Sequence, residues 1–286
     1  MQYSIENDIL RLTVDSHGAE PVSVIHKPTG AELLWQADPA VWKRHAPILF
    51  PYTGKLTGGK MLAKGVEYAG GQHGFARDVE HTMTHHADNL LEFELPKWPY
   101  AFVLRSTFTL EGETVHHTLT VENPVEDKLC FGIGYHPAFA LPFDDRHVTE
   151  DYEIRFDGVE SPLCVSAQPN GLLNGQSYYL ARNVEAIQLT DDLFDNDSHA
   201  MVNLRSAHVS VIEKDTGRSV ICDVSDFPYT LIWSAPKKPL HFICIEPWHS
   251  LPGEENGPID WEQRPCAAIL KKGESWSTTL STTFVR

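Results

Sequence analysis

Short runs in which apolar and polar residues alternate recur along the whole chain, and turn residues close most of them. In Ile9–Asp15 (ILRLTVD), leucine or valine occupies every second position from Leu10 onwards. This period of two predicts a strand with one buried face, because successive side chains of a strand point to opposite sides. The same alternation, or an enrichment in β-branched and aromatic residues, predicts strands in Ser23–Pro28, Ala31–Gln36, Leu90–Pro96, Phe102–Leu110, Thr114–Pro124, Tyr152–Gly158, His208–Ser225, Tyr229–Ala235, His241–Pro247 and Ser277–Arg286.

Turn residues connect these strands, and helical periodicity is nearly absent. Within His208–Ser225 the turn Asp215–Gly217 separates two alternating runs and predicts a hairpin. Only Ala40–His45 and Trp261–Leu270 predict a turn or two of helix, and Pro265 interrupts the second. Many strands with little helix predict an all-β fold, either a large antiparallel β-sandwich or a barrel-like double sheet.

The chain has 286 residues, a length that fits two small domains or one large all-β domain. It contains no linker rich in proline, glycine or serine, no charge block and no repeat of fixed period. We therefore expect a single domain over residues 1–286. Long irregular connections that carry histidine and aspartate, such as residues 51–78, are where a site would be built on such a scaffold.

The charge of the chain limits its possible partners, and its cysteines and N-terminus indicate the compartment in which it is expected. Lys and Arg number 23 against 39 Asp and Glu, so the net charge of -16 argues against nucleic acid and anionic membranes as partners. The five cysteines show no CxxC spacing and are expected to be reduced core residues. The N-terminus lacks the pattern of a signal peptide, and no segment approaches the about 18 apolar residues of a membrane span, so a cytoplasmic protein is expected.

Three stretches combine glycine or proline with a histidine or glutamate among apolar neighbours. In GQHGFARD the glycines beside His73 free its backbone, while Arg77 is available to pair with Asp78 or with a ligand. Taken alone, this stretch is more typical of a turn that carries a surface histidine.

The second stretch is FGIGYHPAFALP, Phe131–Pro142, in which Pro137 favours an extended conformation at His136. A buried histidine bonded to a carbonyl group is one interpretation, and a general acid is the other, since imidazole titrates near neutral pH.

The third stretch is ICIEPWHSLPG, Ile243–Gly253, which places Glu246 at the end of a run that has the composition of a buried strand. An ionised carboxylate seldom occupies such a position without compensating partners. Trp248 offers a flat apolar ring of the kind that stacks on a sugar. Glu246 and Trp248 together predict a sugar site.

Other catalytic and metal motifs are absent from the sequence. There is no GxSxG elbow, no P-loop and no GxGxxG opening a helix. The pairs His85-His86 and His116-His117 place neighbours on opposite faces of a strand, so neither pair can converge on one metal within a sheet. The acidic run from Asp191 to His199 lacks the spacing of a calcium loop.

Taken together and in this order, HGFARD, GYHPAF and IEPWHS resemble the aldose 1-epimerase (galactose mutarotase) family, closest to its LacX-like branch. The resemblance includes Gly18–Trp35 and Pro47–Gly59 and extends over almost the whole chain. It implies a galactose mutarotase-like supersandwich with a sugar-binding groove. It also implies interconversion of the α and β anomers of a free aldose without a cofactor. A monomer or a homodimer is expected, and the sequence does not decide between them.

The resemblance implies a role for each matching residue. The catalytic base falls on Glu246, the catalytic acid on His136 and the sugar-binding histidine on His73. The family's arginine corresponds to Lys55, which cannot form the same bidentate planar contact. The family's acidic sugar ligand falls on either Asp195 or Asp197, and the sequence leaves this choice open.

The chemistry of the residues agrees with these roles. Opening a pyranose ring requires a base at the anomeric hydroxyl and an acid at the ring oxygen, and Glu246 with a protonated His136 supplies both. No metal is expected, because the base must stay free to accept a proton.

Three alternatives remain. A glycoside hydrolase needs a second carboxylate, and none is placed as well as Glu246. A silent sugar-binding protein would not need both His136 and Glu246. A hexose-6-phosphate mutarotase needs converging basic residues, for which the candidates are Lys55, Lys60, Lys64 and Arg77.

Overall fold

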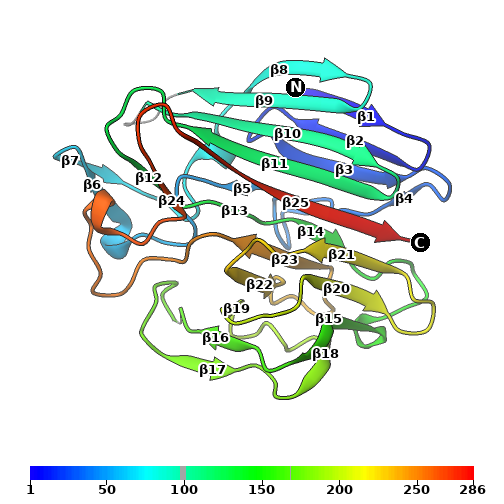
Figure 1. Cartoon of the computed structure of the whole chain (residues 1–286). Helices are drawn as coiled ribbons and strands as arrows, with labels where there is room; N and C mark the ends of the chain where they lie inside the picture. The colour runs from blue at the N-terminus through cyan, green and yellow to red at the C-terminus, as the bar shows by residue number, and fades with distance from the viewer. Residues whose placement is uncertain (97–100, 168) are drawn as a thin grey trace.

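The computed structural model describes residues 1–96, 101–167 and 169–286, and nearly all of its regular structure is β-strand (Figure 1). The predicted all-β class is confirmed, because the strands pair antiparallel and the sheets pack into a large β-sandwich. Helical structure within the described residues is limited to the short 3₁₀ turns Thr57–Gly59 (η1), Ala76–Asp78 (η2), Thr149–Asp151 (η3) and Trp261–Gln263 (η4).

The largest sheet has nine strands in the order β18-β15-β20-β21-β25-β11-β10-β9-β8. Burial alternates along β11, where Val115, His117 and Leu119 point inward, as the period of two predicts. The predicted hairpin is confirmed, since β20 pairs with β21 across Asp215–Gly217. The strands are β8 (Thr82–Ala87), β9 (Leu90–Pro96), β10 (Val103–Glu111), β11 (Thr114–Glu122), β15 (Tyr152–Glu160), β18 (Val184–Gln188), β20 (His208–Glu213), β21 (Ser219–Asp223) and β25 (Ser275–Val285).

A second sheet has the order β17-β16-β19-β22-β23-β13-β5, with β14 also paired to β23. Its strands are β5 (Ile48–Leu49), β13 (Gly134–Tyr135), β14 (Ala138–Ala140), β16 (Leu163–Val165), β17 (Ser177–Tyr179), β19 (His199–Met201), β22 (Tyr229–Trp233) and β23 (Phe242–Trp248). Several of them have only two or three residues, too few to show a period in the sequence.

Three smaller sheets complete the fold. They consist of β1 (Gln2–Glu6), β2 (Leu10–Asp15), β3 (Glu20–His26) and β4 (Ala31–Glu32); of β6 (Lys60–Ala63) with β7 (Val66–Ala69); and of β12 (Leu129–Phe131) with β24 (Ala268–Leu270).

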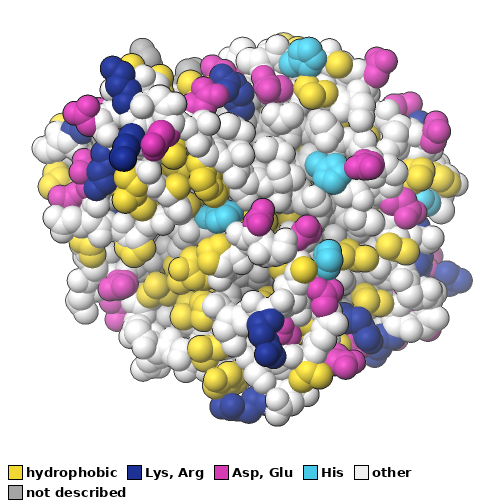
Figure 2. Space-filling model, viewed as in Figure 1, with side chains coloured by type: hydrophobic (Ala, Val, Ile, Leu, Met, Phe, Trp, Pro, Cys, Tyr) yellow, Lys and Arg dark blue, Asp and Glu magenta, His cyan; other side chains and the backbone are white. Residues whose placement is uncertain are grey.

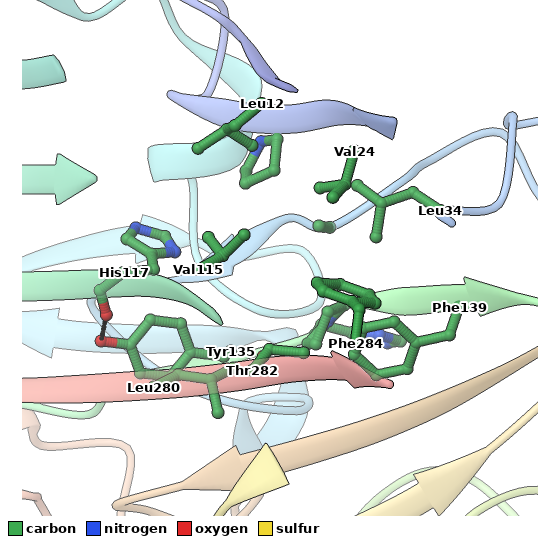
Figure 3. A pocket seen from close by; sticks show the side chains of 14 residues that line it. Leu12, Val24, Leu34, Val115, His117, Tyr135, Phe139, Leu280, Thr282 and Phe284 are labelled. Atoms are coloured by element: carbon green, nitrogen blue, oxygen red, sulfur yellow. Dashed lines mark hydrogen bonds between the residues drawn. The ribbon is translucent and has the colours of Figure 1, made fainter. Parts of the chain in front are cut away.

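One continuous core joins the N-terminal sheet to the larger sheets. Leu12 and Val24 face Phe284 of β25 across a small apolar cavity of about 40 Å³ (Figure 3). In the same region the hydroxyl of Tyr135 donates to the backbone oxygens of His117 at 2.8 Å and Thr278 at 2.9 Å. These bonds fix the end of β13, and the residue that follows is His136.

The prediction of a helical turn or two at Ala40–His45 is wrong. The N–H groups of Val41 and Trp42 both donate to the backbone oxygen of Asp38, which closes a single turn. The chain then leaves this turn because the ring of Trp42 packs against His136. At Trp261–Leu270 the helix is limited to η4, and the last three residues form β24.

Charged side chains of both signs are interspersed on the face shown in Figure 2. The excess of acidic residues is therefore not gathered into one patch on this face. Among the described residues, none of the helical segments has the length and apolar character that crossing a bilayer requires.

Candidate active site

Strand β23 has two different faces, and Glu246 lies on the face that points away from the main core. Ile243 and Ile245 belong to the main core, whereas Cys244 and Trp248 belong to separate apolar clusters. Because side chains alternate along a strand, Glu246 shares a face with Cys244 and Trp248. Its side chain is only 2% exposed.

His136 reaches the same face from the connection between β13 and β14, both of which pair with β23. Its Nε2 lies 3.3 Å from Oε2 of Glu246. One side of the imidazole stacks on Trp42, with ring centroids 5.0 Å apart, and Trp233 meets it edge-on at 5.6 Å. The two indoles hold the His136 ring in contact with the carboxyl group.

Burial changes the protonation of this pair. It raises the pKa of Glu246 well above the ordinary value, and the negative charge of Asp197 adds to the rise. Burial also lowers the pKa of His136 to about 3, helped by the positive charge of Arg77. Both shifts favour the uncharged forms, since removal of water penalises either charge.

A single proton on the unliganded pair is therefore held by Glu246 rather than by His136. The sequence led us to expect a desolvated carboxylate whose pKa is raised, with an imidazolium and sugar hydroxyls compensating its charge. The raised pKa of Glu246 agrees with this expectation, whereas the lowered pKa of His136 means that the empty site does not hold an imidazolium.

His73 lies on another side of His136, with ring centroids 5.5 Å apart. Its Nδ1 accepts a hydrogen bond from the N–H of Gly54 at 3.0 Å, so the proton of the neutral ring is on Nε2. Burial lowers the pKa of His73 well below the ordinary value. The ring is thus a neutral donor with a fixed tautomer.

The backbone around His73 depends on one glycine. His73 has φ of 67° and Gly74 has φ of 73°. A Cβ atom at Gly74 would lie 2.0 Å from the backbone oxygen of Phe50, so only glycine allows this close approach.

One open groove of about 530 Å³ is lined by His73, His136 and Glu246. Three more residues proposed from the sequence also line this groove: Arg77, Asp197 and Trp248. The structure thus brings together residues that are widely separated along the chain.

Arg77 and Asp197 differ in their exposure. The Arg77 side chain is 12% exposed, its guanidinium donates to the backbone oxygen of Gln72 at 2.7 Å, and its Nε is buried without a hydrogen-bond partner. Asp197 is exposed and has φ of 77°. Arg77 is therefore part of the wall, and Asp197 is part of the rim.

Trp248 is a packed part of the groove. It is 3% exposed, its Nε1 donates to the backbone oxygen of Tyr135 at 3.2 Å, and its ring meets His73 edge-on. Stacking of a sugar on Trp248 remains a prediction.

Two of the sequence candidates lie elsewhere. Nζ of Lys55 donates to the backbone oxygen of Asn170 at 2.8 Å, and Lys55 is absent from the groove lining. Asp195 pairs with Lys238 at 3.1 Å outside the groove. The choice between Asp195 and Asp197 as a groove residue thus falls on Asp197.

A further group of groove residues, most of them from one segment, was not predicted from the sequence. Trp42, Lys43 and Arg44 line the groove together with Trp233. Arg44 pairs with Asp78 at 2.6 Å. A tryptophan followed by two basic residues could have indicated a binding site in this segment. The segment was predicted to be helical instead and was not considered as part of the site.

Two groups of described side chains have the composition of a metal site. Asp144, His147 and Glu213 form one, but Arg218 pairs with both carboxylates and already supplies the positive charge. Cys244 lies beside His136 and Glu246 in the other. The absence of a metal requirement remains a prediction.

Comparison with known proteins identifies relatives over the full length. The family model described as Aldose 1-epimerase matches residues 1–283. The plasmid and chromosomal forms of Protein LacX from Lactococcus lactis subsp. lactis are each 32% identical over 266 residues, which is 88% of this chain and 88% of theirs.

Solved structures show the same fold. A galactose mutarotase related enzyme from Lactobacillus acidophilus is 30% identical, with a TM-score of 0.94 over 100% of this chain and 98% of its own. A galactose mutarotase-like protein from Lactobacillus casei is 27% identical, with a TM-score of 0.89 over 99% of this chain and 100% of its own.

Proposed function

Because the chain belongs to the aldose 1-epimerase family, we propose that it is an isomerase that interconverts the α and β anomers of a free hexose such as galactose or glucose. The observation that carries this proposal is the 3.3 Å contact between His136 and Glu246 at the wall of an open groove. The proposed reaction needs no cofactor, because it consists of proton transfers and rotation about one C–C bond.

The reaction requires an acid and a base that are immediate neighbours. The proton to be removed is on O1, the proton to be delivered goes to O5, and both oxygens are bonded to C1. Nε2 of His136 and Oε2 of Glu246 are close enough to face these two oxygens together. Ring opening then permits rotation about C1–C2, and closure gives the other anomer.

The pair needs one proton for this task. In the empty site that proton is on Glu246. Sugar hydroxyls that enter the groove donate hydrogen bonds to the carboxylate, which favours transfer of the proton to His136. Glu246 then removes the O1 proton while His136 protonates O5, and the roles reverse on closure.

Other groove residues would bind the sugar without exchanging protons. Nε2–H of His73 would donate to a hydroxyl oxygen, since its tautomer is fixed by Gly54. Asp197 at the rim would accept from a hydroxyl, and the guanidinium of Arg77 would donate to one. The sugar would thus be held around its edge while C1 faces the acid–base pair.

Two other functions fit the geometry less well. A glycoside hydrolase uses two carboxylates separated by roughly 5 to 9.5 Å across the bond to be cleaved. Here the group in contact with Glu246 is an imidazole, and Asp197 lies exposed at the rim. A silent binding protein would have no use for a buried acid–base contact, whose charged form costs free energy.

The experiment is to dissolve pure α-glucose or α-galactose and follow anomer equilibration by NMR or polarimetry with and without the protein. We expect faster equilibration with one of these sugars and no net consumption. Sugar binding without acceleration would instead identify a silent binding protein, and release of a sugar from a glycoside would identify a hydrolase.

A second candidate substrate is a hexose 6-phosphate, which the basic side of the groove favours. Lys43, Arg44 and Arg77 line this side, whereas Lys60 pairs with Glu67 and Lys64 with Glu126 outside the groove. The substitution Lys43→Gln tests this candidate, because Lys43 is exposed. It should raise KM for a hexose 6-phosphate and leave KM for the free hexose unchanged.

A further inference from the structure

Two cysteines outside the groove, Cys130 and Cys266, line one small cavity. Cys130 belongs to β12 and Cys266 immediately precedes the segment that pairs with it, where the N–H of Ala267 donates to the backbone oxygen of Phe131 at 2.8 Å. The side chains of Cys130 and Cys266 line this cavity beside Arg264. Neither thiol lines the sugar groove.

The two thiols are not equivalent. Cys130 is 2% exposed, whereas Cys266 is partly exposed. The hydrogen bond from Cys130, the N–H of Phe131 and the charges of Lys128 and Arg264 lower the pKa of Cys266 to about 7. The same contact and burial raise the pKa of Cys130 far above the usual range.

This asymmetry gives each thiol a separate function. At pH 7 a thiol with this pKa is about half ionised, whereas an ordinary cysteine with a pKa of about 8.5 is ionised to only about 3%. Cys266 is thus an accessible nucleophile, and Cys130 is a protected thiol beside it.

We propose that Cys266 and Cys130 form a redox pair that closes into a disulfide when a peroxide oxidises the Cys266 thiolate. The thiolate attacks one oxygen of hydrogen peroxide, the O–O bond breaks, hydroxide leaves and Cys266 becomes a sulfenic acid. The sulfur of Cys130 then attacks the sulfur of Cys266. The S–O bond breaks, and the leaving hydroxide takes the Cys130 proton to form water.

The other three cysteines provide the contrast within the same chain. Cys164, Cys222 and Cys244 are fully buried, and burial raises the pKa of each thiol. They should react slowly with peroxide in the folded protein. The proposal is independent of the proposed catalytic function, because its readout is the state of the thiols.

The test treats the full-length protein with hydrogen peroxide at pH 7 and counts thiols after denaturation, with peptide mapping under non-reducing conditions. We expect the wild type to lose two of its five thiols, to give a peptide crosslinked between Cys130 and Cys266, and to recover both thiols with dithiothreitol. The matched control Cys222→Ser should give the same crosslinked peptide.

Two variants separate the roles of the pair. Cys266→Ser should slow peroxide-dependent thiol loss by at least roughly 15-fold, because the four remaining thiols are buried and less ionised than an ordinary cysteine. Cys130→Ser should stop at a sulfenic acid on Cys266 that dimedone traps; if this buried substitution prevents folding, Cys266→Ser alone carries the test. Equal oxidation of all five thiols, or a disulfide with other partners, would overturn the proposal.

Discussion

The imidazole of His136 and the carboxyl group of Glu246 meet at 3.3 Å in a setting where the two side chains are 8% and 2% exposed. Contact between an acid and a base at such burial favours one shared proton over two separate charges. As an ion pair, these two buried groups would cost free energy of desolvation. As an acid and a base that share one proton, they can exchange protons with a bound sugar. The groove gives a sugar access to this contact.

Removal of the carboxyl group should separate binding from catalysis. Glu246→Gln keeps the volume and part of the hydrogen bonding, so sugar binding should survive while the rate falls by a factor on the order of 10² to 10⁴. Anomer equilibration by NMR and sugar titration by calorimetry measure the two effects. A variant that binds sugar and equilibrates anomers within a few-fold of the wild-type rate would exclude Glu246 as the base.

The pH profile of kcat/KM should show no loss of activity from protonation of a histidine near pH 6.5. An exposed histidine would titrate near 6.5, whereas burial lowers the pKa of His136 to about 3. His136 therefore gains no proton as the pH falls to about 5, and kcat/KM should be nearly flat through pH 6.5. Activity should fall at higher pH, when Glu246 loses its proton through its raised pKa. Loss of activity from pH 7 to pH 5, after correction for the buffer rate, would contradict this protonation scheme.

The same carboxyl group should limit stability. The pKa of Glu246 is raised above its ordinary value of 4.5, so the folded state keeps a proton that the unfolded state releases as the pH rises. Stability is therefore lost from about pH 4.5 upward, until the folded pKa is passed. Glu246→Gln cannot ionise and should have a higher Tm than the wild type at pH 7.5, with a smaller difference at pH 4.5. An equal difference at both values would show that burial does not perturb this group.

The fixed tautomer of His73 permits a selective substitution. In His73→Asn, the side-chain oxygen can still accept from the N–H of Gly54, and asparagine tolerates the positive φ at this position. The Nε2–H donor, which is proposed to bind a sugar hydroxyl, is lost. KM should rise by roughly 2- to 12-fold, the value of a neutral hydrogen bond, with kcat and Tm little changed. A fall in kcat with constant KM would instead place His73 in the chemical step.

Two nearby aspartates allow a controlled test of which one is the acidic sugar ligand. Asp197 lines the groove, whereas Asp195 pairs with Lys238 outside it. Asp197→Asn should raise KM by about 10-fold, in the range expected for a hydrogen bond to a charged group. Asp195→Asn should leave KM unchanged, since a surface ion pair contributes little. The reverse order of effects would remove Asp197 from the proposed site.

Local sequence patterns were sufficient to predict the all-β class of the fold. The period of two in Thr114–Glu122 and the turn at Asp215–Gly217 are properties of single strands and single hairpins, and the structure confirms both. His73, His136 and Glu246 also stood out locally, because each combines a polar side chain with glycine, proline or apolar neighbours.

Only the tertiary structure decided how these parts meet. Pairing of β13 and β14 with β23 brings His136 to Glu246, and no pattern within either segment encodes that distance. The local pattern of Ala40–His45 predicted a turn or two of helix, whereas the position of Trp42 depends on its packing against His136, which comes from a distant segment.

The position of the proton in the His136–Glu246 pair is the clearest example of a property that the sequence alone does not determine. The sequence determined which residues are able to act as acid and base. Their protonation depends on how much water the folded chain removes from both groups and on which charges, such as Arg77 and Asp197, lie around them. These are sums over residues from distant segments, and only the folded chain brings those segments together.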